Sequence, residues 1–167
     1  MAFTGYHACA GASGNPLSHS FSTGIYELFI NGAPASEFTV NSLIAGSFGL
    51  PVVFISGDSA VCEQAKAFIP GITTVPVVEG FGDASISMHP EEAAELIQTG
   101  MEKALRGSWQ DCRVPLANEY EIIMRLTTHQ AATKAENYPG TKRMDNRTVR
   151  FVAQDVLDIR RFLYFAL

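Results

Sequence analysis

The sequence has few of the features that mark secreted, membrane or disulfide-stabilised proteins. It contains only three cysteines, an odd number without C-x-x-C spacing, so it predicts no disulfide framework and favours a reducing compartment. No apolar run reaches the roughly 18–20 residues of a membrane span. The first residues lack the basic and apolar regions of a secretory signal. We therefore expect a cytoplasmic protein with no membrane partner.

Basic residues are also scarce. Twelve Lys and Arg face seventeen Asp and Glu, which gives a net charge of −5. Binding to nucleic acid requires an excess of Lys and Arg on some face, so we expect no nucleic-acid partner. The composition, with 47% hydrophobic and 17% charged residues, is that of a globular protein with a sizeable core.

Segments typical of strands alternate with segments typical of helices along the whole chain. Ser36 and Asp58 have the side chains of helix N-caps, and Asn31-Gly32 is a tight-turn signal. This order predicts one layered α/β domain over residues 1–167, with a mainly parallel sheet flanked by helices. The expected strands are 2–6, 24–30, 51–55, 73–78, 121–126 and 148–153, and the expected helices are 36–48, 59–68, 90–106, 128–136 and 155–167.

Two of the four histidines flank a loop of small residues near the start of the chain. His7 follows the first expected strand, and the carboxyl ends of strands are where α/β folds place ligands. A neutral imidazole there is a metal ligand or a titratable base. The alternative is that His7 forms local hydrogen bonds that organise the loop. His19, in Ser18-His19-Ser20, is a candidate base, acid or nucleophile, or part of a polar cap for the next element.

Glu37 is the third candidate, in the first turn of an expected helix. The helix dipole alone explains many acids at this position. Two imidazoles and one carboxylate are nevertheless suitable zinc donors, although no tight motif such as H-E-x-x-H is present. Asn15, Ser18 and Asn41, polar residues of the same segments, are the predicted substrate-binding residues.

Four other residues have simpler explanations. Asp58 follows a buried strand at the expected ligand edge, where N-capping accounts for it. Cys9 is expected to be a small buried thiol. His89 precedes Pro90 at a helix start, and His129 is expected on a helix surface.

The order GYHA, LSHS, Asn31-Gly32, SEFTVN, then PVV and SGD resembles the D-aminopeptidase family of zinc metallopeptidases (M55). The similarity is specific from about residue 3 to residue 78 and general beyond. It implies that His7 and Glu37 are zinc ligands and that His19 is the catalytic nucleophile or base; Ser36 replaces the family's usual Gly. It also implies a two-zinc site, a ring-like homo-oligomer, and release of N-terminal D-residues from short peptides.

The sequence departs from the family in its ligand set. Family members begin with a D-x-E motif on their first strand and carry a further SH motif, which supply the remaining ligands. Neither precedes Gly5 here, and His7 with Glu37 are fewer than the three protein ligands of a usual catalytic zinc. We therefore expect a fragment, a half that completes its site with another chain, or a degenerate descendant.

The leading hypothesis is a metallo-aminopeptidase-like hydrolase of short peptides, D-residue peptides among them. In this hypothesis the backbone N–H groups around Gly11 to Asn15 stabilise the oxyanion. One alternative is a non-catalytic binding or assembly subunit. Another is a metal-independent isomerase or cyclase that depends on His19.

Overall fold

The computed structural model describes residues 1–167, which divide into two compact units, each built from several segments. The first unit comprises Met1–Ala8, Ala12–Ser18 and Asn41–Leu116, and the second comprises Cys9–Gly11, His19–Val40 and Ala117–Leu167. The expectation of a single domain over 1–167 stays a prediction.

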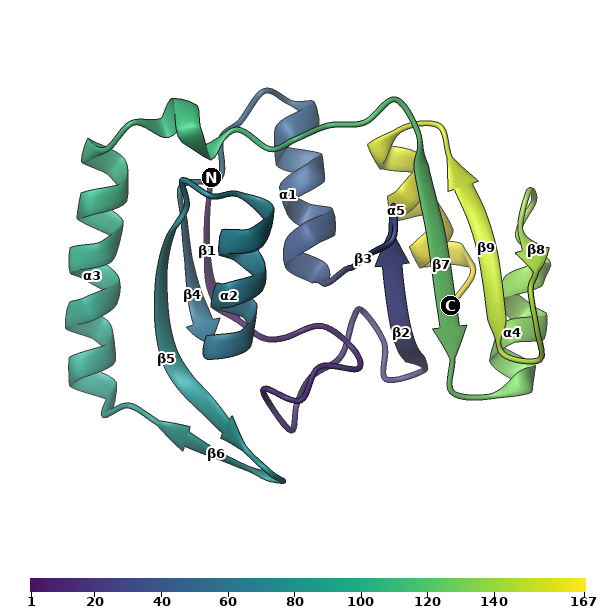
Figure 1. The fold of residues 1–167 in the computed structure, drawn as a ribbon, viewed down its shortest axis with the longest axis horizontal. Coiled ribbons are helices and arrows are strands. Elements are labelled where there is room, and N and C mark those ends of the chain that lie inside the picture. Colours follow the sequence, from purple (N-terminus) through teal and green to yellow (C-terminus); the bar gives the residue numbers. More distant parts are fainter. The chain divides into compact units, whose positions relative to one another are not determined.

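The first unit contains a four-stranded sheet in the order β1-β4-β5-β6 (Figure 1). Strand β4 pairs in parallel with both β1 and β5, while β6 returns antiparallel to β5. The expected mainly parallel sheet is confirmed here. The strands are β1 (Ala2–Tyr6), β4 (Phe54–Asp58), β5 (Thr73–Phe81) and β6 (Ala84–Ser87).

Helices α2 and α3 pack against β4 and β5 of this sheet (Figure 1). All residues of β4 are buried, as expected for the central strand of a covered sheet. Both helices match their expected bounds, and α3 has acids in its first turn and bases in its last. The unit's helical elements are α2 (Ser59–Phe68), α3 (Pro90–Arg106), the short 3-10 helix η1 (Trp109–Cys112) and most of α1 (Glu37–Ser47).

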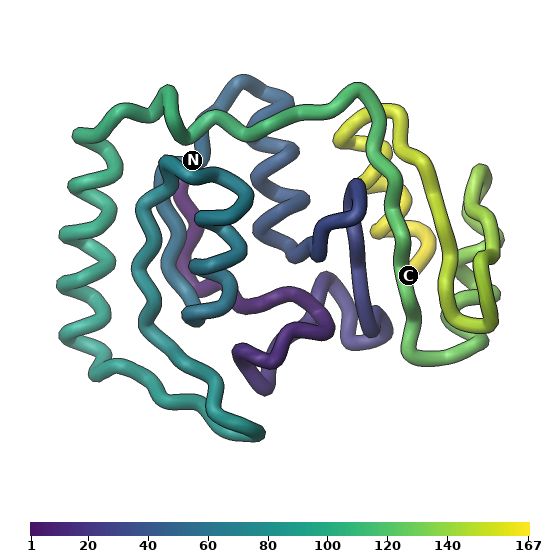
Figure 2. Tube along the Cα trace, viewed as in Figure 1, coloured from purple at the N-terminus to yellow at the C-terminus, as the bar shows by residue number.

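Strand β4 begins three residues later than expected. Pro51 has no N–H, and the amides of Val52 and Val53 bond outside the ladder, to Cys112 and Met1 carbonyls. The apolar run continues through these residues, but regular pairing starts only at Phe54. The shift carries the end of β4 to Asp58, opposite the end of β1, and Figure 2 shows the two segments running side by side.

The second unit contains a five-stranded sheet in the order β3-β2-β7-β9-β8, all antiparallel. This second, antiparallel sheet was not predicted from the sequence. Buried and half-buried residues alternate strictly along β7 and β9, which is typical of a sheet covered on one face. The strands are β2 (Ile25–Ile30), β3 (Ala33–Pro34), β7 (Tyr120–Leu126), β8 (Lys142–Arg143) and β9 (Thr148–Ala153).

The turn Asn31-Gly32 joins β2 to β3 as expected, with φ of 50° and 78°. Helices α4 (His129–Glu136) and α5 (Val156–Phe165) pack against β7 and β9. Their core includes stacked rings of Phe151 and Phe162, with centroids 4.6 Å apart. No helix of either unit is both long enough and apolar enough to span a membrane.

The aromatic core of the second unit gives a first test. Phe162 is fully buried, whereas Phe165 on the same helix is 66% exposed. We expect Phe162→Ala to lower the free energy of unfolding by about 3–5 kcal/mol, because it removes buried ring contacts and leaves a cavity. Phe165→Ala is the matched control and should change it little. Urea denaturation followed by circular dichroism measures both, and equal midpoints for the two variants would contradict the packing described.

Candidate metal-binding and catalytic site

His7 directly follows β1 in the first unit. Because β1 and β4 are parallel, their carboxyl ends meet at one edge of the sheet, with Tyr6 opposite Gly57. The His7 ring is half-buried, and its Nδ1 lies 3.1 Å from the carbonyl oxygen of Ala8. If Nδ1 carries the ring proton and donates to this carbonyl, the lone pair lies on Nε2. Nε2 is then the nitrogen available to bind a metal. The expected position of His7 at a strand end is confirmed.

Asp58 ends β4 at the same edge and is 1% exposed. Its Oδ1 accepts the amide of Val61 at 2.7 Å, which confirms the expected N-cap of α2. Its Oδ2 accepts two further donors, the amide of Ala8 at 2.8 Å and Nδ2 of Asn15 at 2.9 Å. Asp58 therefore binds the loop that follows His7 as well as the helix that it caps.

Glycine allows the close approach of chain segments at this edge. A Cβ at Gly57 would lie 2.0 Å from the carbonyl oxygen of Tyr6. A Cβ at Gly14 would lie 2.3 Å from the Cβ of Ala60, and one at Gly80 would lie 2.1 Å from the Gly14 carbonyl oxygen. Gly14 is thus required for packing the loop against the first unit's own elements.

The predicted substrate-binding residues have polar partners in the first unit. Asn15 Oδ1 accepts the amide of Leu17 at 2.9 Å, and the Ser18 hydroxyl donates to the Asn15 carbonyl at 2.5 Å. Nδ2 of Asn41 donates to the Tyr6 hydroxyl at 3.0 Å. These contacts shape the loop and hold α1 to the end of β1. A role of the three residues in substrate binding stays a prediction.

His19 and Glu37 come together within the second unit. His19 Nε2 lies 3.8 Å from Glu37 Oε1, and the two side chains are 35% and 20% exposed. The same carboxylate oxygen accepts the amide of Phe21 at 2.6 Å. Phe21 has a φ of 61°, a left-handed conformation that is uncommon for a bulky residue. Glu37 therefore has specific partners in the His19 loop, beyond its favourable place in the helix dipole.

Buried serines fix this loop and the start of α1. Ser20 is fully buried; its hydroxyl donates to the Ala35 carbonyl at 2.9 Å and accepts the Ala10 amide at 3.1 Å. Ser36 accepts the Thr39 amide at 3.3 Å, so its expected N-capping of α1 is confirmed. The residues on both sides of the His19–Glu37 pair are thus held by hydrogen bonds within the unit.

The thiols offer no reactive nucleophile. Cys9, Cys62 and Cys112 are all buried and unbridged, as expected for Cys9. Burial, and next the charge of Asp58, raise the pKa of Cys62 to about 11. Burial also raises the pKa of Cys112. A thiolate at neutral pH is therefore disfavoured at both positions.

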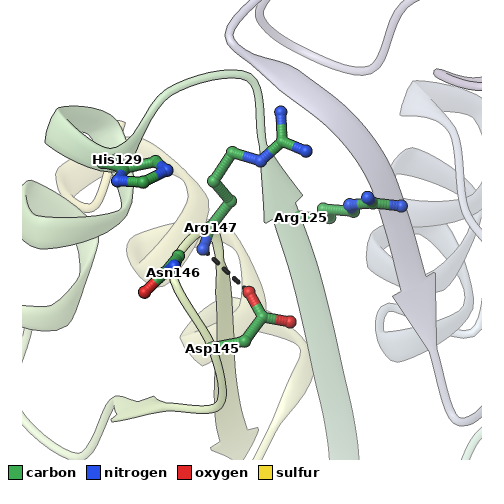
Figure 3. A pocket seen from close by; sticks show the side chains of 5 residues that line it. All are labelled: Arg125, His129, Asp145, Asn146 and Arg147. Carbon is green, nitrogen blue, oxygen red and sulfur yellow. Dashed lines mark hydrogen bonds between the residues drawn. The ribbon is translucent and has the colours of Figure 1, made fainter.

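A cavity of about 450 Å³ in the second unit is lined by Arg125, His129, Asp145, Asn146 and Arg147 (Figure 3). None is a predicted site residue. Asp145 accepts the amides of Arg147 and Thr148, and these bonds lower the pKa of its carboxyl. Arg125 pairs with Glu27 at 3.3 Å. The charged groups of this cavity thus stabilise a turn and a strand pair.

The other two histidines lie where the sequence placed them. His89 caps α3, with Nδ1 accepting the Glu91 amide at 3.4 Å. His129 is exposed at the first residue of α4.

Glu37 of the second unit has the donor type that zinc takes. His19 Nε2 lies 3.8 Å from Glu37 Oε1, so the imidazole is placed beside this candidate ligand. Imidazole nitrogen and carboxylate oxygen are also the donor types that zinc takes in proteins. Glu37 keeps a second oxygen, Oε2, in addition to the one bound by Phe21.

Known proteins match both the sequence and the fold. The model of the D-aminopeptidase family, peptidase M55, matches residues 1–165. A D-aminopeptidase of Bacillus subtilis (strain 168) is 28% identical over 158 residues, which cover 93% of this chain and 57% of that protein. A solved structure of the Zn-dependent D-aminopeptidase DppA from Bacillus subtilis, described as a self-compartmentalizing protease, matches with a TM-score of 0.86 and 28% identity. That match covers 99% of this chain and 62% of DppA.

The fold is the one seen in DppA, which is described as a Zn-dependent D-aminopeptidase. The chain belongs to the D-aminopeptidase family, peptidase M55. It spans less than two thirds of the length of either relative.

Glu37 gives a test of the site's local structure. We expect Glu37→Ala to lower the free energy of unfolding by about 1 kcal/mol, because the Phe21 amide loses its acceptor in a partly buried place. Glu37→Gln keeps an acceptor oxygen and should lower the free energy of unfolding by less. Urea denaturation compares the two variants, and equal losses would show that the bond to Phe21 contributes nothing.

Proposed function

We propose that this protein is a zinc-dependent aminopeptidase-like hydrolase that removes the N-terminal residue from short peptides, including D-residues. Membership of the D-aminopeptidase family and the zinc dependence stated for DppA support this proposal. The observation that carries it is the His19–Glu37 pair, 3.8 Å apart and fixed by the Phe21 amide. A base beside a candidate metal ligand is an arrangement suited to metal-dependent peptide hydrolysis.

In this proposal His7 and Glu37 are the zinc ligands. A zinc held by these residues would supply polarisation of the scissile carbonyl and a lower pKa for a bound water. Nε2 of His7 serves as the ligand atom while Nδ1 bonds to the Ala8 carbonyl. Because a catalytic zinc takes three protein ligands in most enzymes, the proposal requires at least one donor beyond these two.

His19 is the proposed base or nucleophile. As a base, its imidazole takes the proton of the attacking water and returns it to the leaving amine. The Glu37 carboxylate faces the charge that the ring carries between the two transfers. Asn15, Ser18 and Asn41 are proposed to contact substrate, and backbone N–H groups between Gly11 and Asn15 to stabilise the oxyanion.

A second candidate function follows from the small number of proposed zinc ligands. His7 and Glu37 alone fall short of a catalytic zinc site, which favours a binding or assembly subunit that keeps the fold without the metal. A related alternative uses His19 without metal in an isomerisation or cyclisation.

We further propose that the protein forms a homo-oligomer in the cytoplasm. The self-compartmentalizing nature of DppA supports the assembly, and three unbridged cysteines suit a reducing compartment. Light scattering on the purified chain measures the subunit number; a monomer at all concentrations would contradict the proposed assembly.

The function is tested by metal content and peptidase activity together. We expect the purified chain to bind zinc and to hydrolyse short peptides with an N-terminal D-residue. His7→Ala and Glu37→Ala should lose the zinc, while His19→Ala should keep it and lose roughly 10²–10⁴-fold in turnover, the usual contribution of a general base. His129→Ala, on the exposed start of α4, is the control and should match the wild type.

The alternatives give different results. A zinc-free, inactive chain that His7→Ala leaves unchanged would exclude the hydrolase and support the binding subunit. Metal-free turnover that His19→Ala abolishes would support the isomerase or cyclase.

A further inference from the structure

Asp58 is the only acidic or basic residue of the chain that is buried. A charged group is costly to bury unless hydrogen bonds satisfy it. Asp58 meets this condition with three donors at 2.7–2.9 Å. Helix capping, however, requires only one of its oxygens, because a serine at the same position would cap α2 equally well. The second oxygen, Oδ2, is therefore the feature to be explained.

Oδ2 acts on the residue that orients the His7 ring. It accepts the Ala8 amide at 2.8 Å, and the carbonyl oxygen of the same Ala8 lies 3.1 Å from His7 Nδ1. Ala8 is thus held at its N–H by a buried carboxylate and bonds to the imidazole through its C=O. One residue, Ala8, therefore links the Asp58 carboxylate to the His7 imidazole.

Oδ2 also holds the far part of the loop. Nδ2 of Asn15 donates to it at 2.9 Å, and Asn15 in turn accepts the amide of Leu17. The segments that enter and leave this part of the loop in the first unit are therefore bound to the same oxygen atom. Asp58 lies at the carboxyl end of the central, fully buried strand β4, which gives it a rigid support.

We propose that Asp58 is a positioning residue for His7: through the Ala8 peptide it fixes the orientation of the imidazole and the tautomer with the lone pair on Nε2. The outer partners of metal-binding histidines commonly fix ring orientation and tautomer in this way. The assignment of His7 as a zinc ligand rests on the proposed function, whereas the orientation of its ring does not.

The decisive variant is Asp58→Ser. Serine keeps a cap for α2 but is too short to reach Ala8 and Asn15, so it separates capping from positioning. Asp58→Asn is a second variant of nearly the same shape, which turns an amide donor toward either the loop or the helix. The control is Asp155→Asn, because Asp155 caps α5 through a similar 2.7 Å bond to the Asp158 amide.

Two measurements are made on each full-length variant. The first needs no metal: ¹⁵N-resolved NMR of the His7 ring gives the tautomer, and hydrogen exchange gives the protection of the Ala8 amide. We expect Asp58→Ser to mix the tautomers and to speed Ala8 exchange by at least about tenfold. The second is zinc affinity, which we expect to fall by about tenfold, the lower end of the effect of removing an outer partner, because Asp58 acts on the ring only through Ala8. Asp155→Asn should leave both at wild-type values.

The outcomes separate this inference from the proposed function. A wild type that binds no zinc would exclude the proposed metal site, and the NMR measurement would still decide the role of Asp58. Unchanged tautomer and Ala8 exchange in both Asp58 variants would overturn the positioning role, even if zinc binds tightly.

Discussion

In both units, a carboxylate at the start of a helix accepts a backbone N–H from the loop that carries a histidine. Asp58, the N-cap of α2, binds the amide of Ala8 next to His7. Glu37, the first residue of α1, binds the amide of Phe21, two residues after His19. Small-residue loops have little side-chain packing of their own, so these charge-assisted bonds help to fix the two loops. The candidate site depends on these two carboxylates.

The sequence predicted the elements that local patterns determine. Helices α2 and α3, strands β1 and β9 and the Asn31-Gly32 turn have caps, periodicity or turn residues that act over a few positions. The antiparallel second sheet is formed by strands far apart in the chain, so the mere alternation of strands and helices did not reveal it. The exposed β6 has no buried face and therefore no apolar pattern.

The candidate residues were predictable to different degrees. His7 at a strand end and the Ser36 cap before Glu37 followed from local patterns, and the family resemblance supplied their proposed roles. The second function of Asp58 was missed because Ala8 lies 50 residues away in the sequence. The signal that was present is a charged residue three positions after the apolar run 51–55. The left-handed Phe21, which directs its amide to Glu37, has no sequence signal at all.

The central proposal is that His7 is a zinc ligand. Zinc K-edge X-ray absorption on the loaded protein tests it most directly, because imidazole gives a characteristic scattering pattern. We expect imidazole nitrogen at about 2.0–2.1 Å from the metal in the wild type, and loss of the bound zinc, with its imidazole signal, in His7→Ala. A spectrum without imidazole, or one that His7→Ala leaves unchanged, would contradict the account.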